Sequence, residues 1–512
     1  MPTETYIETA PSALTEDQAS VARSIGLTGL LLVVLGALVL ILNSAKAKLG
    51  VEIGNNVAFA AIVLGMAMMF YHATRDTDQL IRRLYGFVGG LGLALSGVIL
   101  SILPLIISAS RSAPEEGTKP IISLFFPFGW ACFLAGLFFL MPFCRNETDR
   151  QQRNYALWGM GLIGLGLALV GFIGGLISAK FAVSYGSVLA LHGLAYFVAL
   201  VSQLGGADLD GYRPALGIGI LGLVVIGCAL IRSTILGPFP YFIPAGLGLI
   251  IIGVAYALTA VFLVSDWEIV VLTRRELLAY FCSPIAYILI FISGLVAWLS
   301  YNKFVFLLAR GMPEPIVLRY FLGDLNGVLM LLFVVPALTM RLVSEEKRSG
   351  TYEVLMCAPV SETPVALSKF LASLVFYMLV WSVWLVFLLD VRVEADKPFE
   401  FRPLISFYLA LAASGASFLA MGLFFSSLTR NQIVAAALTF LGMVVWLGVF
   451  FIADAAPRDS TRFTILNHLS FVQLWLESLQ GRLHLRDLII QVSIAAFWLF
   501  LAVKVLEARR WT

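Results

Sequence analysis

Charged residues are scarce in this sequence of 512 residues. Asp, Glu, Lys and Arg together make up 13% of the chain, about half of the share in a typical soluble domain. Hydrophobic residues make up 60%, which argues against a soluble globular protein. The net charge of +3 contains no basic excess of the kind that attracts nucleic acid, so we expect no nucleic-acid partner.

Cysteines are few as well. The five cysteines are scattered, without the spacing of a disulfide framework or a zinc site, so we interpret them as small buried residues. The N-terminus also lacks the basic region that begins a signal peptide. Residues 1–23 are polar and acidic instead, and we predict that they form a cytosolic tail.

Catalytic motifs are missing too. The sequence contains no G-x-x-x-x-G-K-[ST] phosphate loop, no H-E-x-x-H pair and no nucleophile elbow. We therefore predict that the chain is not an enzyme and that it carries no catalytic, cofactor-binding or metal-binding residues of its own.

Long apolar runs are what the sequence does contain. Each run is long enough to cross a hydrocarbon core of about 30 Å, and the runs are continuous rather than alternating, so they predict transmembrane helices. The fold class is all-α, a polytopic membrane bundle of roughly 14 helices. We predict spans near residues 24–43, 56–72, 84–107, 121–143, 155–178, 184–204, 215–235, 241–264, 284–307, 321–342, 366–390, 402–428, 431–453 and 487–506.

The first eight spans have the pattern of four helical hairpins, which we assign to an N-terminal membrane domain at residues 24–264. Each hairpin opens on a Gly-rich span and closes on a charged exit such as "RDTDQLIRR" or "RNETDRQQR". Duplication of one unit explains this pattern, although a general Gly-Leu bias could mimic it. Arginines are densest in the exits, which predicts that the exits and the N-terminus are cytosolic.

The composition of the sequence changes near residue 265, where we place the start of a second domain, 265–512. The stretch "DWEIVVLTRRELLAYFCSP", residues 266–284, is too charged to span. It sets Arg274, Arg275 and Glu276 against apolar neighbours, which predicts a helix lying in the membrane interface. An ordinary juxtamembrane linker is the alternative.

The stretch "RLVSEEKRSGTYEVLMCAPVSETP", residues 341–364, places charges between two apolar runs. Gly350 can supply a break with positive φ. Thr351 suits a helix N-cap, Glu353 suits the first turn and Pro359 ends the apolar turn that follows. We predict a short helix at the membrane surface that docks in a groove of a cytosolic partner.

This stretch resembles the coupling helix of ABC-2 type permeases, the membrane subunits of ATP-binding cassette transporters. The residues that carry the resemblance are Glu345, Glu346, Lys347, Arg348, Gly350, Thr351, Glu353, Val354, Leu355, Met356, Pro359 and Val360. The stretch "TRRELLAYFCSPIAYILI" is similar to the elbow helix and first span of the same family. The resemblance covers residues 266–512, so the role of residues 24–264 is not inherited from it.

The C-terminus resembles the gliding-motility-associated branch of the family. The residues concerned are Gly481, Arg486, Asp487, Leu506, Glu507, Arg509, Arg510 and Trp511. The resemblance implies that the chain is the permease subunit of an exporter. It also implies a bacterial inner membrane as the location, with both termini in the cytosol. It also implies two copies of a cytosolic ATPase subunit that binds the ATP, and a second permease subunit as homo- or heterodimer.

Other readings stay open at this stage. An ion-coupled secondary transporter would need ionisable residues within the membrane, for which His192, Asp390 and Lys180 are the candidates. A membrane enzyme would need a catalytic motif or a cluster of facing carboxylates, which the sequence lacks, and a purely structural scaffold fits the N-terminal half better than the whole chain. In the connection 454–486, Phe471, Leu474, Trp475 and Leu479 form an amphipathic set that either covers a translocation path or packs as a lid without substrate contact. We expect His468 to be a surface residue.

Overall fold

The computed structural model divides the chain into two compact units, Met1–Val264 and Ser265–Thr512. All regular elements in the part of the chain that it describes are helices. The description covers residues 16–44, 55–75, 78–110, 119–147, 149–204, 209–234, 241–281, 283–309, 316–323, 326–352, 361–395, 402–457 and 460–508.

Within these residues, 12 helices are long and apolar enough to cross a membrane, which confirms a polytopic all-α membrane protein. The two further spans that we expected, near 56–72 and 121–143, lie in helices α2 and α5. In α5, the apolar stretch Cys132–Arg145 is shorter than a membrane span.

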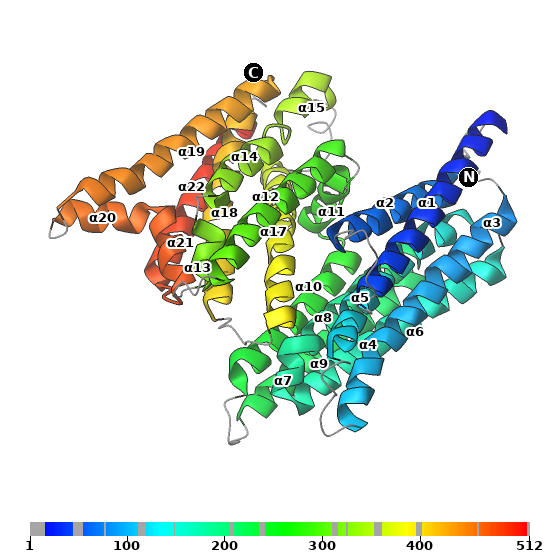
Figure 1. The fold of residues 1–512 in the computed structure, drawn as a ribbon. Coiled ribbons are helices and arrows are strands. Elements are labelled where there is room, and N and C mark those ends of the chain that lie inside the picture. The colour runs from blue at the N-terminus through cyan, green and yellow to red at the C-terminus, as the bar shows by residue number, and fades with distance from the viewer. Residues whose placement is uncertain are drawn as a thin grey trace. The chain divides into compact units, whose positions relative to one another are not determined.

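The first unit begins with α1, and its helices are labelled in Figure 1. Helix α1 starts at Glu16, so residues 16–23, the end of the predicted polar tail, are helical. The bounds are α1 Glu16–Ser44, α2 Asn55–Arg75, α3 Gln79–Leu84, η1 Tyr85–Gly92, α4 Leu93–Ser110, α5 Lys119–Asn146, α6 Arg150–Ile177, α7 Ala179–Phe181, η2 Ala182–Gly186, α8 Ser187–Leu204, α9 Leu209–Thr234, η3 Phe242–Gly246 and α10 Leu247–Val264.

These helices pack chiefly in four pairs, α1 with α2, α4 with α5, α6 with α8 and α9 with α10. In three pairs a glycine of the second helix faces a glycine of the first, and in the α4–α5 pair Gly136 of α5 faces Gly90 of η1, which leads into α4. A Cβ added to the second glycine would lie only 2.5 to 2.9 Å from the carbonyl oxygen of the first. Small residues at such positions let two backbones approach closely. The glycine pairs are Gly65 with Gly29, Gly136 with Gly90, Gly193 with Gly164, and Gly253 with Gly222.

Buried tyrosines join the second, third and fourth pairs to one another. The hydroxyl of Tyr196 on α8 donates to the carbonyl oxygen of Phe133 on α5 at 2.8 Å. The hydroxyl of Tyr256 on α10 donates in the same way to Ala190 on α8 at 2.7 Å. A buried hydroxyl is costly without a partner, so these bonds fix how one pair lies on the next.

Charged exits also meet in this unit. Arg83, at the end of α3, lies 3.3 Å from Glu147 and 3.4 Å from Asp149, which follow α5. Arg153, in the first turn of α6, donates to the carbonyl oxygen of Gln203 near the end of α8 at 2.9 Å. Three of the hairpin exits therefore lie at one end of the first unit.

The second unit contains the remaining helices. Their bounds are α11 Glu268–Phe281, α12 Pro284–Ala309, α13 Ile316–Leu322, α14 Asn326–Thr339, α15 Ser344–Ser349, α17 Glu362–Ala395, α18 Arg402–Leu428, α19 Gln432–Ala455, α20 Thr461–Leu469, α21 Phe471–Leu479 and α22 Leu485–Ala508. The apolar window of α18 is 72% buried, whereas that of α19 is 17% buried. Helix α18 therefore lies in the core, and α19 presents most of its apolar surface outward.

Aromatic side chains fill this core. Trp381, Trp384 and Trp475 are fully buried. Phe321 of α13 stacks on Trp384 of α17 with 5.4 Å between ring centroids. The indole nitrogen of Trp475 on α21 donates to Ser414 Oγ on α18 at 2.9 Å. The core of the second unit thus joins the α13–α14 segment, α17, α18 and α21.

This packing bears on the amphipathic set in the connection 454–486. Phe471, Leu474, Trp475 and Leu479 are all buried, at 3% exposure or less. They form the inner face of α21, so their role within the second unit is core packing.

Candidate functional site

The segment at residues 344–360, which we call the docking segment, begins with helix α15. The backbone N–H groups of Val343 and Ser344 donate to Ser426 Oγ, near the end of α18, at 3.1 and 3.2 Å. The Lys347 ammonium is buried and donates to the carbonyl oxygen of Ser427. The start of the docking segment is therefore held on α18 through both backbone and side chain.

Helix α15 ends at Gly350, whose φ of 76° lies in the left-handed region. Side chains with a Cβ disfavour this conformation, which explains a glycine here as the sequence indicated. Open space surrounds the position where a Cβ would stand, so the requirement comes from the backbone alone. Glycine thus sets the direction in which the chain leaves α15.

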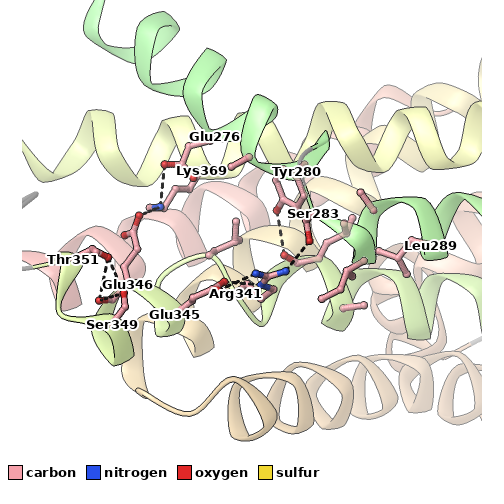
Figure 2. Close-up of a pocket in the computed structure, with 16 residues that line it drawn as sticks. Glu276, Tyr280, Ser283, Leu289, Arg341, Glu345, Glu346, Ser349, Thr351 and Lys369 are labelled. Atoms are coloured by element: carbon pink, nitrogen blue, oxygen red, sulfur yellow. Dashed lines mark hydrogen bonds and ion pairs between the residues drawn. The ribbon is translucent and has the colours of Figure 1, made fainter. Parts of the chain in front are cut away.

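Lys369 of α17 lies at the base of the docking segment, with its side chain 2% exposed. Its Nζ is 2.6 Å from Glu346 Oε1 on α15 and 3.2 Å from Glu276 Oε1 on α11. Figure 2 shows the ammonium between these two carboxylates. A buried charge is tolerated when it is paired in this way, so the three helices are tied together electrostatically.

Arg341 forms a second link. Its guanidinium binds Glu345 through two nitrogens, with Nε 2.6 Å from Oε2 and Nη2 2.9 Å from Oε1. Its Nη1 donates to Ser283 Oγ, just before α12, at 2.8 Å. Such bidentate pairs are geometrically specific, so Arg341 fixes the orientation of α15 relative to the start of α12.

Tyr280 of α11 completes the base of the segment. Its hydroxyl donates to the carbonyl oxygen of Leu338 on α14 at 3.1 Å, and its ring stacks on Phe376 with centroids 5.1 Å apart. Burial raises the pKa of Tyr280, so its hydroxyl stays a neutral donor at physiological pH. The elbow helix predicted from the sequence is therefore bonded to α14 as well as to α17.

A cavity of about 340 Å³ lies among these groups. One side is lined by the ion pairs just described, and the other by apolar side chains such as Ile285, Leu289 and Leu342. We call the five charged residues at its edge the ion-pair network: Glu276, Arg341, Glu345, Glu346 and Lys369. The network surrounds open space at the point where α11, α14, α15 and α17 meet (Figure 2).

The predicted site residues fall into three groups. Glu276, Glu345 and Glu346 are in the network, and Arg275 pairs with Glu276 at 2.9 Å. Arg348 and Thr351 are exposed, and Arg274 donates to the carbonyl oxygen of Ser265 at 2.7 Å. The predicted docking residues Glu353, Val354, Leu355, Met356, Pro359 and Val360 lie outside the described residues, as do Arg509, Arg510 and Trp511.

Two network members, Arg341 and Lys369, were missed by the sequence analysis. Arg341 could have been found from its spacing of four residues before Glu345, a helical ion-pair distance. Lys369 could have been found as a lone cation at the start of an otherwise apolar run, where charge is costly.

The candidates for ion coupling show no comparable arrangement. His192 Nδ1 donates to the carbonyl oxygen of Val188, one turn earlier on its own helix, at 2.8 Å. Its ring lies near Trp130 and Phe133. The side chains of Lys180 and Asp390 lie outside the described residues. His192 therefore has the surroundings of a packing residue.

Comparison with known proteins identifies part of the second unit. Residues 305–504 match the family model of the ABC-2 family transporter protein. No curated protein and no solved structure matches the chain. The matched residues include four members of the network, Arg341, Glu345, Glu346 and Lys369. The match begins after α11, so Glu276 lies outside it. Residues 305–504 are thus an ABC-2 family transporter domain, carried by a multi-pass membrane protein.

Proposed function

We propose that this chain is the permease subunit of an ABC transporter and that the docking segment couples it to a separate ATPase. The observation that carries the proposal is the ion-pair network at the base of that segment. The network links the docking segment to α17, within the ABC-2 family transporter domain, and to α11, which precedes that domain in the chain. A force applied to the segment would therefore reach helices that pack in the core.

The strength of the links supports rigid transmission. Separating the buried Lys369 ammonium from its carboxylates would leave a buried charge unpaired, which is costly, so this link favours joint movement of the helices. The left-handed turn at Gly350 fixes where the segment points. In this mechanism closure of the ATPase pushes the docking segment, and α11, α15 and α17 move together around the cavity.

The partners follow from the same proposal. The sequence has no phosphate loop, so ATP is bound and hydrolysed by the partner, with two ATPase copies serving two permease subunits. Export is the direction that we propose, in the gliding-motility-associated branch of the family, on the basis of the sequence resemblance. The ion-coupled alternative has no supporting arrangement among the described residues.

We also propose a bacterial inner membrane with both termini in the cytosol. Three hairpin exits lie at one end of the first unit, and they carry its densest arginine clusters. The positive-inside rule places such clusters in the cytosol. That side is also where an ATPase would reach the docking segment.

The decisive experiment is purification from native membranes in mild detergent, followed by identification of the copurifying proteins. We expect an ABC ATPase subunit whose ATP hydrolysis is stimulated by the assembled complex. Absence of any nucleotide-binding subunit, with transport intact after all candidate ATPases are deleted, would contradict the proposal.

A charge reversal locates the contact. Glu353→Lys should weaken ATPase association, because like charges opposed at an interface can cost several kcal/mol. Asp454→Lys is the matched control, since Asp454 is exposed at the far end of α19. Equal ATPase binding by both variants would show that the docking segment is not the contact.

A further inference from the structure

Two histidines and two carboxylates converge where α20, α21 and α22 meet. Glu477 lies in the last turn of α21, His484 just before α22, and Asp487 in the first turn of α22. Gly481, with φ of 78°, reverses the chain between them. One ligand atom from each of Glu477, His484 and Asp487 lies within 4.8 Å of the other two.

The spacing of these atoms suits a metal ion. His484 Nδ1 is 3.4 Å from Glu477 Oε2. Two ligand atoms bonded at about 2.0–2.1 Å to a tetrahedral zinc ion lie roughly 3.3 Å apart. The histidine–glutamate separation therefore already matches one edge of such a site, and the other two edges are no longer than 4.8 Å.

Neighbouring side chains hold the carboxylates in place. Gln473 donates to Glu477 Oε1 at 2.8 Å, which leaves Oε2 directed toward His484. His468 Nδ1 lies 3.0 Å from Asp487 Oδ1. The side chain of His468 is 21% exposed, so it is partly covered by these contacts. Metal ligands are commonly oriented by such outer contacts.

Charge balance leaves room for a cation. Asp487 is 5% exposed, and its side chain lies 3.5 Å from Arg486 and 3.0 Å from His468. Arg486 also lies 3.0 Å from His468 Nδ1. The cluster thus contains two carboxylates, one arginine and two imidazoles, and a divalent ion bound by the carboxylates and His484 would balance part of the carboxylate charge.

We propose that Glu477, His484 and Asp487 bind a divalent transition metal, for which zinc is the best match. An imidazole with two carboxylates favours zinc over magnesium or calcium, which prefer oxygen ligands alone. The three ligands come from the end of α21, the turn after it and the start of α22, so the reversal of the chain at Gly481 brings them together.

The position of the site gives it a structural role. The docking segment is held beside the end of α18 and the start of α19, whereas α20 follows the other end of α19. Helix α19 has 24 residues, a length of about 36 Å. The metal would therefore join α21 to α22 at the end of the second unit that is remote from the ATPase contact.

The test uses the full chain, purified in detergent with a tag free of histidine, stripped with chelator and titrated with zinc against a chromophoric chelator. We expect about one zinc ion per chain by elemental analysis, with no competition from magnesium. His484→Ala and Glu477→Gln should each weaken zinc binding by at least about tenfold. Gln480→Ala, an exposed neighbour in the same turn, is the control and should bind as the unaltered chain does.

Two results would overturn the proposal. One is no zinc bound at submillimolar concentration by the unaltered, monodisperse chain. The other is equal zinc affinity of the unaltered chain and His484→Ala, which would place the ion elsewhere. Neither result depends on the ATPase, so failure here is distinct from failure of the proposed function.

Discussion

The ammonium of Lys369 lies within 3.2 Å of two carboxylates from different helices. Lys369→Met would leave Glu346 and Glu276 without that cation, and we expect the free energy of unfolding to fall by about 3 kcal/mol. Lys504→Met is the control, because Lys504 forms an exposed pair with Glu507 at 2.6 Å that should contribute at most about 1 kcal/mol. Denaturant unfolding in detergent measures both, and equal losses would refute the importance of burial.

Glu147 offers a prediction on pH at the residue scale. Burial acts to raise its pKa, but the hydrogen bond from Arg83 and the backbone N–H of Asp149 outweigh it, and the pKa lies below its ordinary value near 4.5. A carboxyl with a lowered pKa stabilises the folded state above its unfolded pKa, and this stability is lost as pH falls through the folded value.

We therefore expect unfolding midpoints measured between neutral pH and pH values below about 4.5 to fall less in Glu147→Gln than in the unaltered chain. At neutral pH the variant should already be the less stable of the two. A variant with unchanged pH dependence would show that the Arg83 pair contributes nothing.

The direction in which the docking segment leaves α15 depends on the left-handed backbone at Gly350. Gly350→Ala forces a residue with a Cβ into a left-handed conformation, at a cost of about 1–2 kcal/mol. We expect the variant to fold and insert but to lose ATPase association. Gly448→Ala is the matched control, because open space also surrounds Gly448 but its helical backbone suits alanine. Membrane insertion and copurification are the two measurements, and equal association of both variants would refute the directional role.

The helices were largely predictable, and the links between them were not. Continuous apolar runs indicated the spans, and the Gly350 break was visible because only glycine enters that conformation readily. The pairing of Lys369 with Glu346 and Glu276 had no signal in local spacing, since α17 packs on α11 only in the folded bundle. His468 and Asp487 likewise come together only in the folded chain, because α21 lies between them in the sequence.

At the scale of the whole molecule, the hairpin exits provide the test of orientation. Reporter fusions after Asp78, Glu147, Asp208 and Glu268 should all report the cytosolic side, although Asp208 lies outside the described residues. Insertions after Lys180, between α6 and α8, or after Arg232, in the last turn of α9, should report the opposite side. Two or more exits on the wrong side would contradict both the orientation and the hairpin pattern.

The tyrosine bonds of the first unit have a consequence for how this part of the chain could change in length. Tyr196 and Tyr256 each bond the helix pair that carries them to the pair before it, through a backbone carbonyl that any residue supplies. Such nearest-neighbour contacts make stability nearly a sum over modules, as in repeat proteins. Loss of the last pair, α9 with α10, would remove the Tyr256 bond and leave the Tyr196 bond between the earlier pairs in place, so we expect this unit to tolerate shortening by a whole hairpin at that end.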